Sequence, residues 1–207
     1  MIALETYDGL RVATIRRPEK ANSLTRDMLA ALAEAAEAAG RDCTRALILT
    51  GEGRVFSAGA DLEEARMGLA TDPVWERLSG AIASLPCLTI AALNGTLAGG
   101  AFGMALACDI RLCVPEATFF YPVMRLGFLP QPSDPARLAA LVGPARAKMI
   151  LMAGARIGAP EALAWGLVDR VIPADDLLTA ARTVAADVLA ADKDHAAAIK
   201  ALIQPVR

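Results

Sequence analysis

Residues 88–109 form the stretch that most constrains the fold of this chain. An apolar run follows Pro86 and predicts a buried strand, which Asn94-Gly95 ends. Gly99-Gly100 then precede small and apolar residues without β-branched side chains, a pattern typical of a buried helix. The stretch is therefore predicted to be a strand, a glycine turn and a helix.

The glycine turn at Gly99-Gly100 has two interpretations. The first turn of a helix carries free N–H groups and a partial positive charge. Glycines there let a ligand approach the backbone, which favours a main-chain site for an anion or an oxyanion. Alternatively, the small residues only permit tight helix packing. The turn alone leaves both interpretations open.

A second turn of this kind occurs at residues 56–62. It follows an apolar strand predicted at 46–50 and precedes a helical segment. Asp61 is placed to cap that helix, and we expect this structural role rather than a catalytic one. Two such turns could aim two backbone N–H groups at one oxygen, as in an oxyanion hole.

The remaining chain repeats the order of strand, small-residue turn and helix. Asp8-Gly9 predicts a hairpin, and Thr25 is a plausible N-cap for a helix that ends at Ala39. Further strands are expected at 110–114, 117–121 and 167–172, a loop at 122–132, and helices at 74–84, 133–142, 144–153, 159–165 and within 175–203. This order favours an α/β fold with crossover connections.

Composition excludes several classes of partner. The formal net charge is -2, so no basic field suggests nucleic acid. No apolar run approaches the roughly 18 residues that span a bilayer, and the first residues lack signal-peptide features. We therefore expect a soluble, cytoplasmic protein with neither a nucleic-acid nor a membrane partner.

The cysteines and the histidine argue against metal and triad chemistry. Cys43, Cys87, Cys108 and Cys113 form no C-x-x-C pair and adjoin apolar segments, so reduced core thiols and no metal site are expected. The single histidine, His195, lies in a charged tail and is expected to be exposed. A serine peptidase is therefore disfavoured, because its triad needs a histidine near the serine.

Both turns resemble the signature segments of the crotonase (enoyl-CoA hydratase/isomerase) family. The resembling segments are Phe56-Ser57-Ala58-Gly59-Ala60-Asp61-Leu62 and Asn94-Gly95-Thr96-Leu97-Ala98-Gly99-Gly100. Residues 17–24, 107–110, 126–130 and 165–171 are similar to further family segments, in family order. The resemblance covers nearly the whole chain.

This resemblance implies an α/β fold built as a spiral of ββα repeats. The core would cover residues 1–173, and 174–207 would form a C-terminal helical segment that is shorter than usual for the family. The family usually forms trimers or pairs of trimers, so a homotrimer or hexamer is expected. The substrate would be an acyl-CoA thioester of fatty acid metabolism, with coenzyme A as part of the substrate and no separate cofactor.

The resemblance also assigns site residues. The thioester carbonyl would accept hydrogen bonds from the backbone N–H groups of Ala60 and Gly100. The coenzyme A moiety would contact Ala58, Asp61 and Leu62, with Lys20 and Ala21 nearby. Losing one such oxyanion donor typically costs on the order of 10²–10³ in rate.

Two positions depart from the family pattern. The glutamates that the hydratases of the family use fall here on Gly103 and Val123. Neither residue can transfer a proton, and such assistance is typically worth about 10²–10⁴-fold. We therefore expect efficient hydratase activity to be absent.

Three other side chains are candidates for the missing chemistry. Asp134 is a speculative base, because an apolar setting can raise a carboxyl pKa; the alternative is that it caps its helix together with Ser133. Tyr121 could donate a proton or only pack in the core. Arg125 could pair with an anionic substrate group or lie on the surface.

Two classes of function remain. One is an enzyme of the lyase or isomerase class that acts through Ala60 and Gly100. The other is a non-catalytic acyl-CoA-binding or assembly subunit, in which Gly103 and Val123 mark a lost active site.

Overall fold

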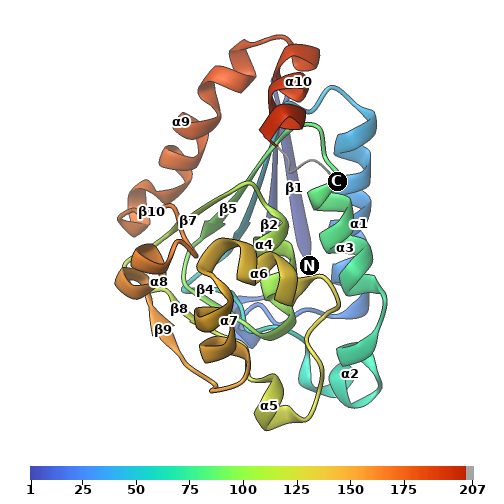
Figure 1. Cartoon of the computed structure of the whole chain (residues 1–207). Helices are drawn as coiled ribbons and strands as arrows, with labels where there is room; N and C mark the ends of the chain where they lie inside the picture. The colour runs from blue at the N-terminus through green and yellow to red at the C-terminus, as the bar shows by residue number, and fades with distance from the viewer. Residues whose placement is uncertain (204–207) are drawn as a thin grey trace.

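Two sheets organise the molecule. The structure is a computed structural model that describes residues 1–203 (Figure 1). The larger sheet has the order β1-β2-β3-β5-β7-β10 and the smaller one β4-β6-β8-β9. In the larger sheet, β1 (Ile2–Tyr7) and β2 (Leu10–Ile15) are antiparallel, whereas β3 (Ala46–Gly51), β5 (Leu88–Leu93), β7 (Ile110–Cys113) and β10 (Arg170–Val171) extend β2 in parallel.

From β3 to β8, successive strands alternate between the two sheets. β3, β5 and β7 lie side by side in the larger sheet, and each is followed by a short strand of the smaller sheet, β4 (Val55–Ser57), β6 (Thr96–Ala98) or β8 (Thr118–Phe120). One or more helices follow each pair. The predicted α/β spiral of ββα repeats is therefore confirmed. β4 and β6 were not predicted, because three residues are too few to show a period.

Helices cover both faces of the larger sheet. α1 (Arg26–Arg41) packs against β1, β2 and α3 (Val74–Ala83); α3 contacts α4 (Phe102–Ala107), and α4 contacts α6 (Asp134–Val142). On the other side, α9 (Leu177–Ala190) packs on β3, β5 and β7, and α10 (Lys193–Ile203) follows it (Figure 1). The remaining helices are α2 (Leu62–Arg66), α5 (Val123–Leu126), α7 (Pro144–Leu151) and α8 (Ala159–Trp165). In the smaller sheet, β9 (Ile157–Gly158) pairs with β8.

The core lies between the sheets and the inner helices. Phe56, Phe102 and Phe119 are fully buried, and burying such a side chain contributes about 1.5–3 kcal/mol. All six residues of α4 are buried. Buried Arg111 of β7 links this strand to the segment before β10, since its guanidinium donates to the carbonyl of Leu167 (3.0 Å), and it also donates to the carbonyl of Cys108 (2.6 Å) at the end of α4.

Most of the predicted helices and strands are present, but several of them begin or end at other residues than predicted. The hairpin at Asp8-Gly9 is confirmed, and so is the cap of α1, because Thr25 Oγ1 accepts a hydrogen bond from Met28 N at 3.2 Å. The predicted end at Ala39 is wrong, since α1 continues to Arg41. The expected strand at 167–172 contracts to Arg170–Val171, and a short helix, α5, occupies part of the expected loop at 122–132.

The burial of the cysteines and of His195 agrees with the predictions except at one cysteine. Cys87, Cys108 and Cys113 are buried as predicted, but Cys43 is exposed, so the core assignment is wrong for that residue. The exposed position of His195 is confirmed. No helix within residues 1–203 is long and apolar enough to cross a membrane. The last four residues of the predicted 174–207 segment lie outside the described part of the chain.

Candidate active site

The two glycine turns touch each other. Gly59 has φ +92 and Gly99 has φ +56, backbone conformations that residues with a side chain rarely adopt. A Cβ atom on Gly59 would lie 2.9 Å from the carbonyl oxygen of Ala98 and 3.5 Å from the amide nitrogen of Gly100. Glycine at position 59 is therefore what allows the turns to approach.

Local pairing orients the amide of Ala60. Leu24 N donates to Gly59 O at 2.8 Å, and Asp61 N donates to Leu24 O at 2.9 Å. Because successive amides of an extended segment face opposite sides, the N–H of Ala60 between these bonds points away from Leu24. Gly100 lies in the turn of 3-10 helix Gly99–Ala101 that leads into α4, where the first N–H groups have no acceptor within the helix.

A cavity of about 150 Å³ lies at the meeting point of the turns. Ala58, Ala60, Leu62 and Gly100 line it. Its wall is mostly apolar and includes the aromatic side chains Trp75, Phe120, Tyr121 and Phe128. The arrangement can hold a compact apolar group beside two backbone amides.

Trp75 forms the wall beside Gly100. Its ring would lie 3.3 Å from a Cβ atom at that position, and its indole N–H donates to Leu69 O at 2.8 Å. Neither Trp75 nor Gln131, which also lines the cavity, was predicted as a site residue. Trp75 reads as an ordinary core residue of amphipathic α3, so no local signal distinguishes it.

The loop at Lys20 and Ala21 lies against the first turn. Ala58 N donates to Ala21 O at 3.0 Å, and Ala21 and Asn22 have left-handed φ values of 51 and 52. Buried Asn22 fixes the loop through Nδ2, which donates to Glu52 O (2.9 Å) and Val55 O (2.6 Å). Lys20 is exposed, and neither Lys20 nor Ala21 is among the residues that line the cavity.

Asp61 performs the expected cap. Its carboxylate accepts from the backbone N–H groups of Glu63 (3.0 Å) and Glu64 (3.3 Å). The guanidinium of Arg17 donates to it at 2.8 Å, and this hydrogen bond lowers the pKa of Asp61 below its usual value. The structural interpretation of Asp61 is therefore confirmed.

A carboxyl group occupies the space beside Gly103. A Cβ atom on Gly103 would lie 2.9 Å from Oδ1 of Asp134, which belongs to the first turn of α6 and is 1% exposed. Val123, the other glutamate position of the family, is buried and lines the cavity. The carboxyl group beside Gly103 thus comes from α6.

Asp134 is bonded to Tyr121. The Tyr121 hydroxyl donates to Oδ2 at 2.9 Å and accepts from Gln131 N at 3.3 Å, whereas Oδ1 has no hydrogen-bond partner within residues 1–203. Burial raises the pKa of Asp134 to about 7 and raises that of Tyr121 above its usual range. Tyr121 lines the cavity and Asp134 lies behind it.

The capping interpretation of Asp134 is wrong. No side chain caps the start of α6, because Ser133 Oγ instead donates to Glu76 Oε2 at 2.6 Å. The packing interpretation of Tyr121 holds in part, since its ring stacks on Phe102 with centroids 5.4 Å apart. Arg125 is exposed on α5 and lines an adjoining hollow that shares Phe120, Tyr121 and Pro122 with the cavity. Arg156 also lines this hollow, and its guanidinium lies 3.8 Å over the ring of Phe120.

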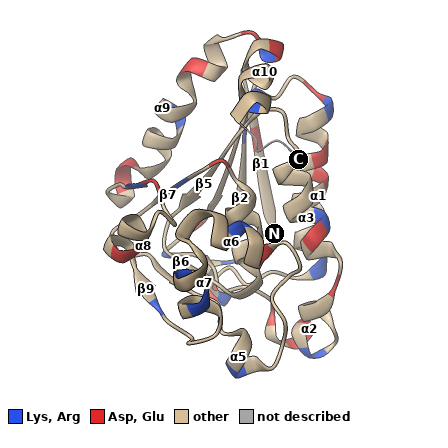
Figure 2. Ribbon diagram, viewed as in Figure 1, with Lys and Arg blue, Asp and Glu red and all other residues tan. Residues whose placement is uncertain are grey.

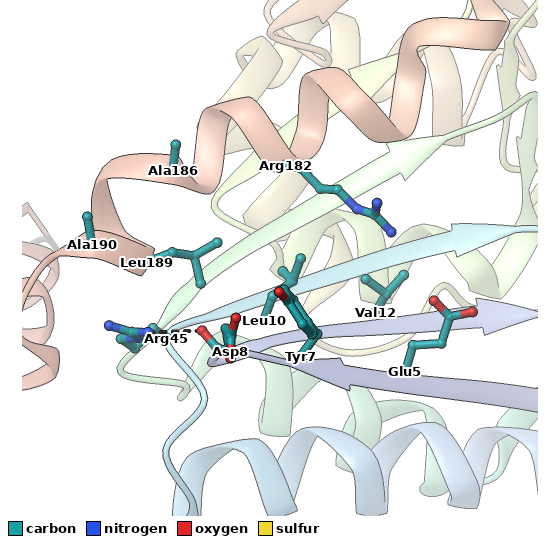
Figure 3. A pocket seen from close by; sticks show the side chains of 10 residues that line it. All are labelled: Glu5, Tyr7, Asp8, Leu10, Val12, Arg45, Arg182, Ala186, Leu189 and Ala190. Carbon is teal, nitrogen blue, oxygen red and sulfur yellow. Dashed lines mark hydrogen bonds between the residues drawn. The ribbon is translucent and has the colours of Figure 1, made fainter.

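A larger hollow lies elsewhere, between the β1–β2 hairpin and α9 (Figure 3). Its volume is about 670 Å³, and charged side chains such as Glu5, Arg45 and Arg182 stand around it. Arg45 donates to Asp8 O at 2.9 Å. Neither glycine turn lines this hollow, so the two backbone N–H groups considered above do not reach it.

Charge is spread over the periphery. Basic and acidic segments are interspersed along the outer helices in Figure 2. Within the described residues, no group of three or more His, Cys, Asp and Glu side chains could hold a metal ion. The smaller cavity at the two turns is therefore the candidate active site.

Comparison with known proteins finds relatives that match most of the chain. The family model described as Enoyl-CoA hydratase/isomerase matches residues 5–205. The chain is 34% identical to 4-chlorobenzoyl coenzyme A dehalogenase-2 of Arthrobacter sp, over 98% of this chain and 77% of that protein. It is 33% identical to the probable enoyl-CoA hydratase echA8 of Mycobacterium leprae, over 90% of this chain and 74% of that protein.

Solved structures share the fold. An enoyl-CoA hydratase/isomerase from Pseudoalteromonas atlantica T6c superposes with a TM-score of 0.91 at 32% identity, covering 98% of this chain and 82% of that one. Enoyl-CoA hydratase subunit I from Geobacillus kaustophilus HTA426 gives a TM-score of 0.89 at 32% identity, covering 98% and 80%. The chain belongs to the enoyl-CoA hydratase/isomerase, or crotonase, family.

Proposed function

We propose that this protein binds an acyl-CoA thioester in the cavity at the two turns, with the thioester oxygen accepting hydrogen bonds from Ala60 N–H and Gly100 N–H. The close approach of the two turns at Gly59 supports this proposal, because Ala60 and Gly100 line the same cavity. Chemistry next to a thioester passes through an oxyanion. Fixed N–H dipoles in an apolar cavity stabilise such a charge, each contributing about 10²–10³ in rate.

The coenzyme moiety would lie along the first turn, beside Ala58, Asp61 and Leu62. The Lys20-Ala21 loop is hydrogen-bonded to Ala58, so the exposed ammonium of Lys20 is available to a phosphate group there. Coenzyme A enters as part of the substrate, and no separate cofactor is invoked. The printed names of the relatives support a shared thioester site better than any one reaction, because they include both a dehalogenase and a hydratase.

The reaction we propose is proton transfer at the carbon next to the thioester, as in isomerase or lyase chemistry, with Asp134 as the basic group that supports the transfer from behind the cavity wall. Gly103 and Val123 offer no carboxyl group, so water cannot be activated from their positions. We expect hydration of crotonyl-CoA to be at least about 10²–10⁴-fold slower than in a hydratase that has both glutamates. Absorbance loss of the conjugated thioester measures this rate, and a turnover equal to that of such a hydratase would contradict the proposal.

One observation favours a non-catalytic acyl-CoA-binding or assembly subunit. Apart from the Trp75 indole, whose N–H is already bonded, only Tyr121 and Gln131 bring polar side-chain groups to the residues lining the cavity. A panel of CoA thioesters screened in parallel for binding and for turnover separates the two functions. Binding without turnover, unchanged in Asp134→Ala, would favour the binder.

Carbonyl polarisation tests the proposed oxyanion site directly. Cinnamoyl-CoA carries a chromophore conjugated to its thioester, so two hydrogen bonds to the oxygen should shift its absorbance to longer wavelength on binding. Butyryl-CoA should also bind more tightly than the thioether S-butyl-CoA, which lacks the carbonyl oxygen. Equal affinity for the two, together with no spectral shift, would refute the proposal. Light scattering tests the predicted homotrimer or hexamer.

A further inference from the structure

Gly103 leaves room on α4 for a carboxyl group from another helix. The side chain of Asp134 fills that space, since its Oδ1 is 2.9 Å from the position of a Cβ atom on Gly103. Any larger residue at position 103 would meet this oxygen. The buried Oδ1 has no hydrogen-bond partner within residues 1–203, so the carboxyl group keeps unused capacity to accept a proton.

Tyr121 separates Asp134 from the cavity. It lines the cavity, and its hydroxyl donates to Asp134 Oδ2 at 2.9 Å. The hydroxyl oxygen of Tyr121 accepts a hydrogen bond from Gln131 N at 3.3 Å, which leaves one lone pair of that oxygen free. The stack against Phe102 holds the ring in place.

Resting on the proposed function, we infer that Tyr121 exchanges the proton with the acyl group and that Asp134, a positioning residue behind it, accepts the proton of the phenol. The C–H bond next to the thioester breaks, and its proton bonds to the Tyr121 oxygen while the original phenol proton moves to Asp134 Oδ2. The electron pair stays on the acyl group as an enolate, whose oxygen accepts from Ala60 and Gly100. Reversal returns a proton to carbon and regenerates both residues.

The charges around Asp134 suit an acceptor near neutral pH. Burial is the main cause that raises its pKa to about 7, the charge of Glu76 on α3 contributes to the rise, and Arg137 on α6 opposes it. The Tyr121 hydrogen bond also lowers this pKa, but burial dominates. Tyr121 itself stays protonated, because burial and the nearby carboxyl group raise its pKa. A neutral phenol between substrate and carboxylate is the state that the relay needs.

Exchange of the α-protons of phenylacetyl-CoA in D₂O, followed by mass spectrometry, tests this inference. The wild-type rate should rise with pH through about 7, the pKa of Asp134. Tyr121→Phe keeps the ring and should slow exchange by about 10²–10⁴-fold, with binding of phenylacetyl-CoA changed only a few-fold. Asp134→Asn should slow exchange and remove the pH dependence.

Glu76→Gln is the matched control. It removes one negative charge near Asp134 while keeping an acceptor for Ser133, so the pH midpoint should fall and the high-pH rate should stay the same. Exchange at the wild-type rate in Tyr121→Phe would overturn the inference. A bound, spectrally shifted cinnamoyl-CoA with no exchange of phenylacetyl-CoA would overturn the relay and leave the thioester site standing. Failure of both measurements would refute the thioester site itself.

Discussion

Replacing Gly59 by alanine should separate the two turns. At φ +92 an alanine is strained, which costs about 1–2 kcal/mol. Its Cβ would also lie 2.9 Å from the Ala98 carbonyl oxygen, and relieving such an overlap inside a packed region costs about 1–3 kcal/mol more. The free energy of unfolding should therefore fall by about 2–5 kcal/mol. The relief must move Ala98 and Gly100 away from Ala60.

Gly68→Ala supplies the comparison. Gly68 has a similar φ of +104, but a Cβ atom there would meet nothing within 4 Å, so only the conformational cost of about 1–2 kcal/mol applies. Urea unfolding followed by tryptophan fluorescence measures both variants. The absorbance shift of bound cinnamoyl-CoA should be lost in Gly59→Ala and kept in Gly68→Ala. Equal destabilisation of the two variants, with the shift retained in both, would refute the reasoning about the turns.

Three further predictions concern stability. Asn22→Ala should lower the free energy of unfolding by about 2–4 kcal/mol in urea titration, because two backbone carbonyls lose their buried donor. The pKa of Asp61 is lower in the folded chain than its unfolded value of about 3.9, so ionised Asp61 stabilises the fold at pH values above about 3.9. This stabilisation is lost as the pH falls through the pKa of Asp61 in the folded chain. Arg17→Met should therefore move acid unfolding, followed by circular dichroism, to higher pH. The raised pKa of Asp134 predicts the opposite slope, with stability falling as pH rises from about 4 to about 7, and Asp134→Asn should flatten that slope in urea titrations across this range.

The sequence predicted what depends on local pattern. Asp8-Gly9, Thr25 and Asp61 each act through neighbours within a few residues, so the hairpin and the two caps followed from residue type alone. The glycine turns were found in the same way, since left-handed backbone favours glycine wherever it occurs. The assignment of Ala60 and Gly100 to one site came from the family resemblance, because no local signal joins residues of different repeats.

The environment of Asp134 could not be predicted, because it depends on three elements that meet only in the folded chain. A serine and an aspartate before a proline are typical of a helix cap, and that pattern gave the wrong assignment. The deciding factor is the empty space over Gly103, which a sequence pattern does not show. Short elements such as α5 were missed for a simpler reason, since one helical turn carries no measurable period.

The complete burial of α4 bears on how this protein could change its chemistry. Every residue of that helix is buried, so α4 holds the adjacent Gly100 in a fixed position, and substitutions within the helix would be poorly tolerated. New reactive groups are more easily introduced from α6 and from the end of β8, whose side chains reach the same region from outside. A redesign of this scaffold should therefore leave α4 intact and vary the residues around positions 121–134.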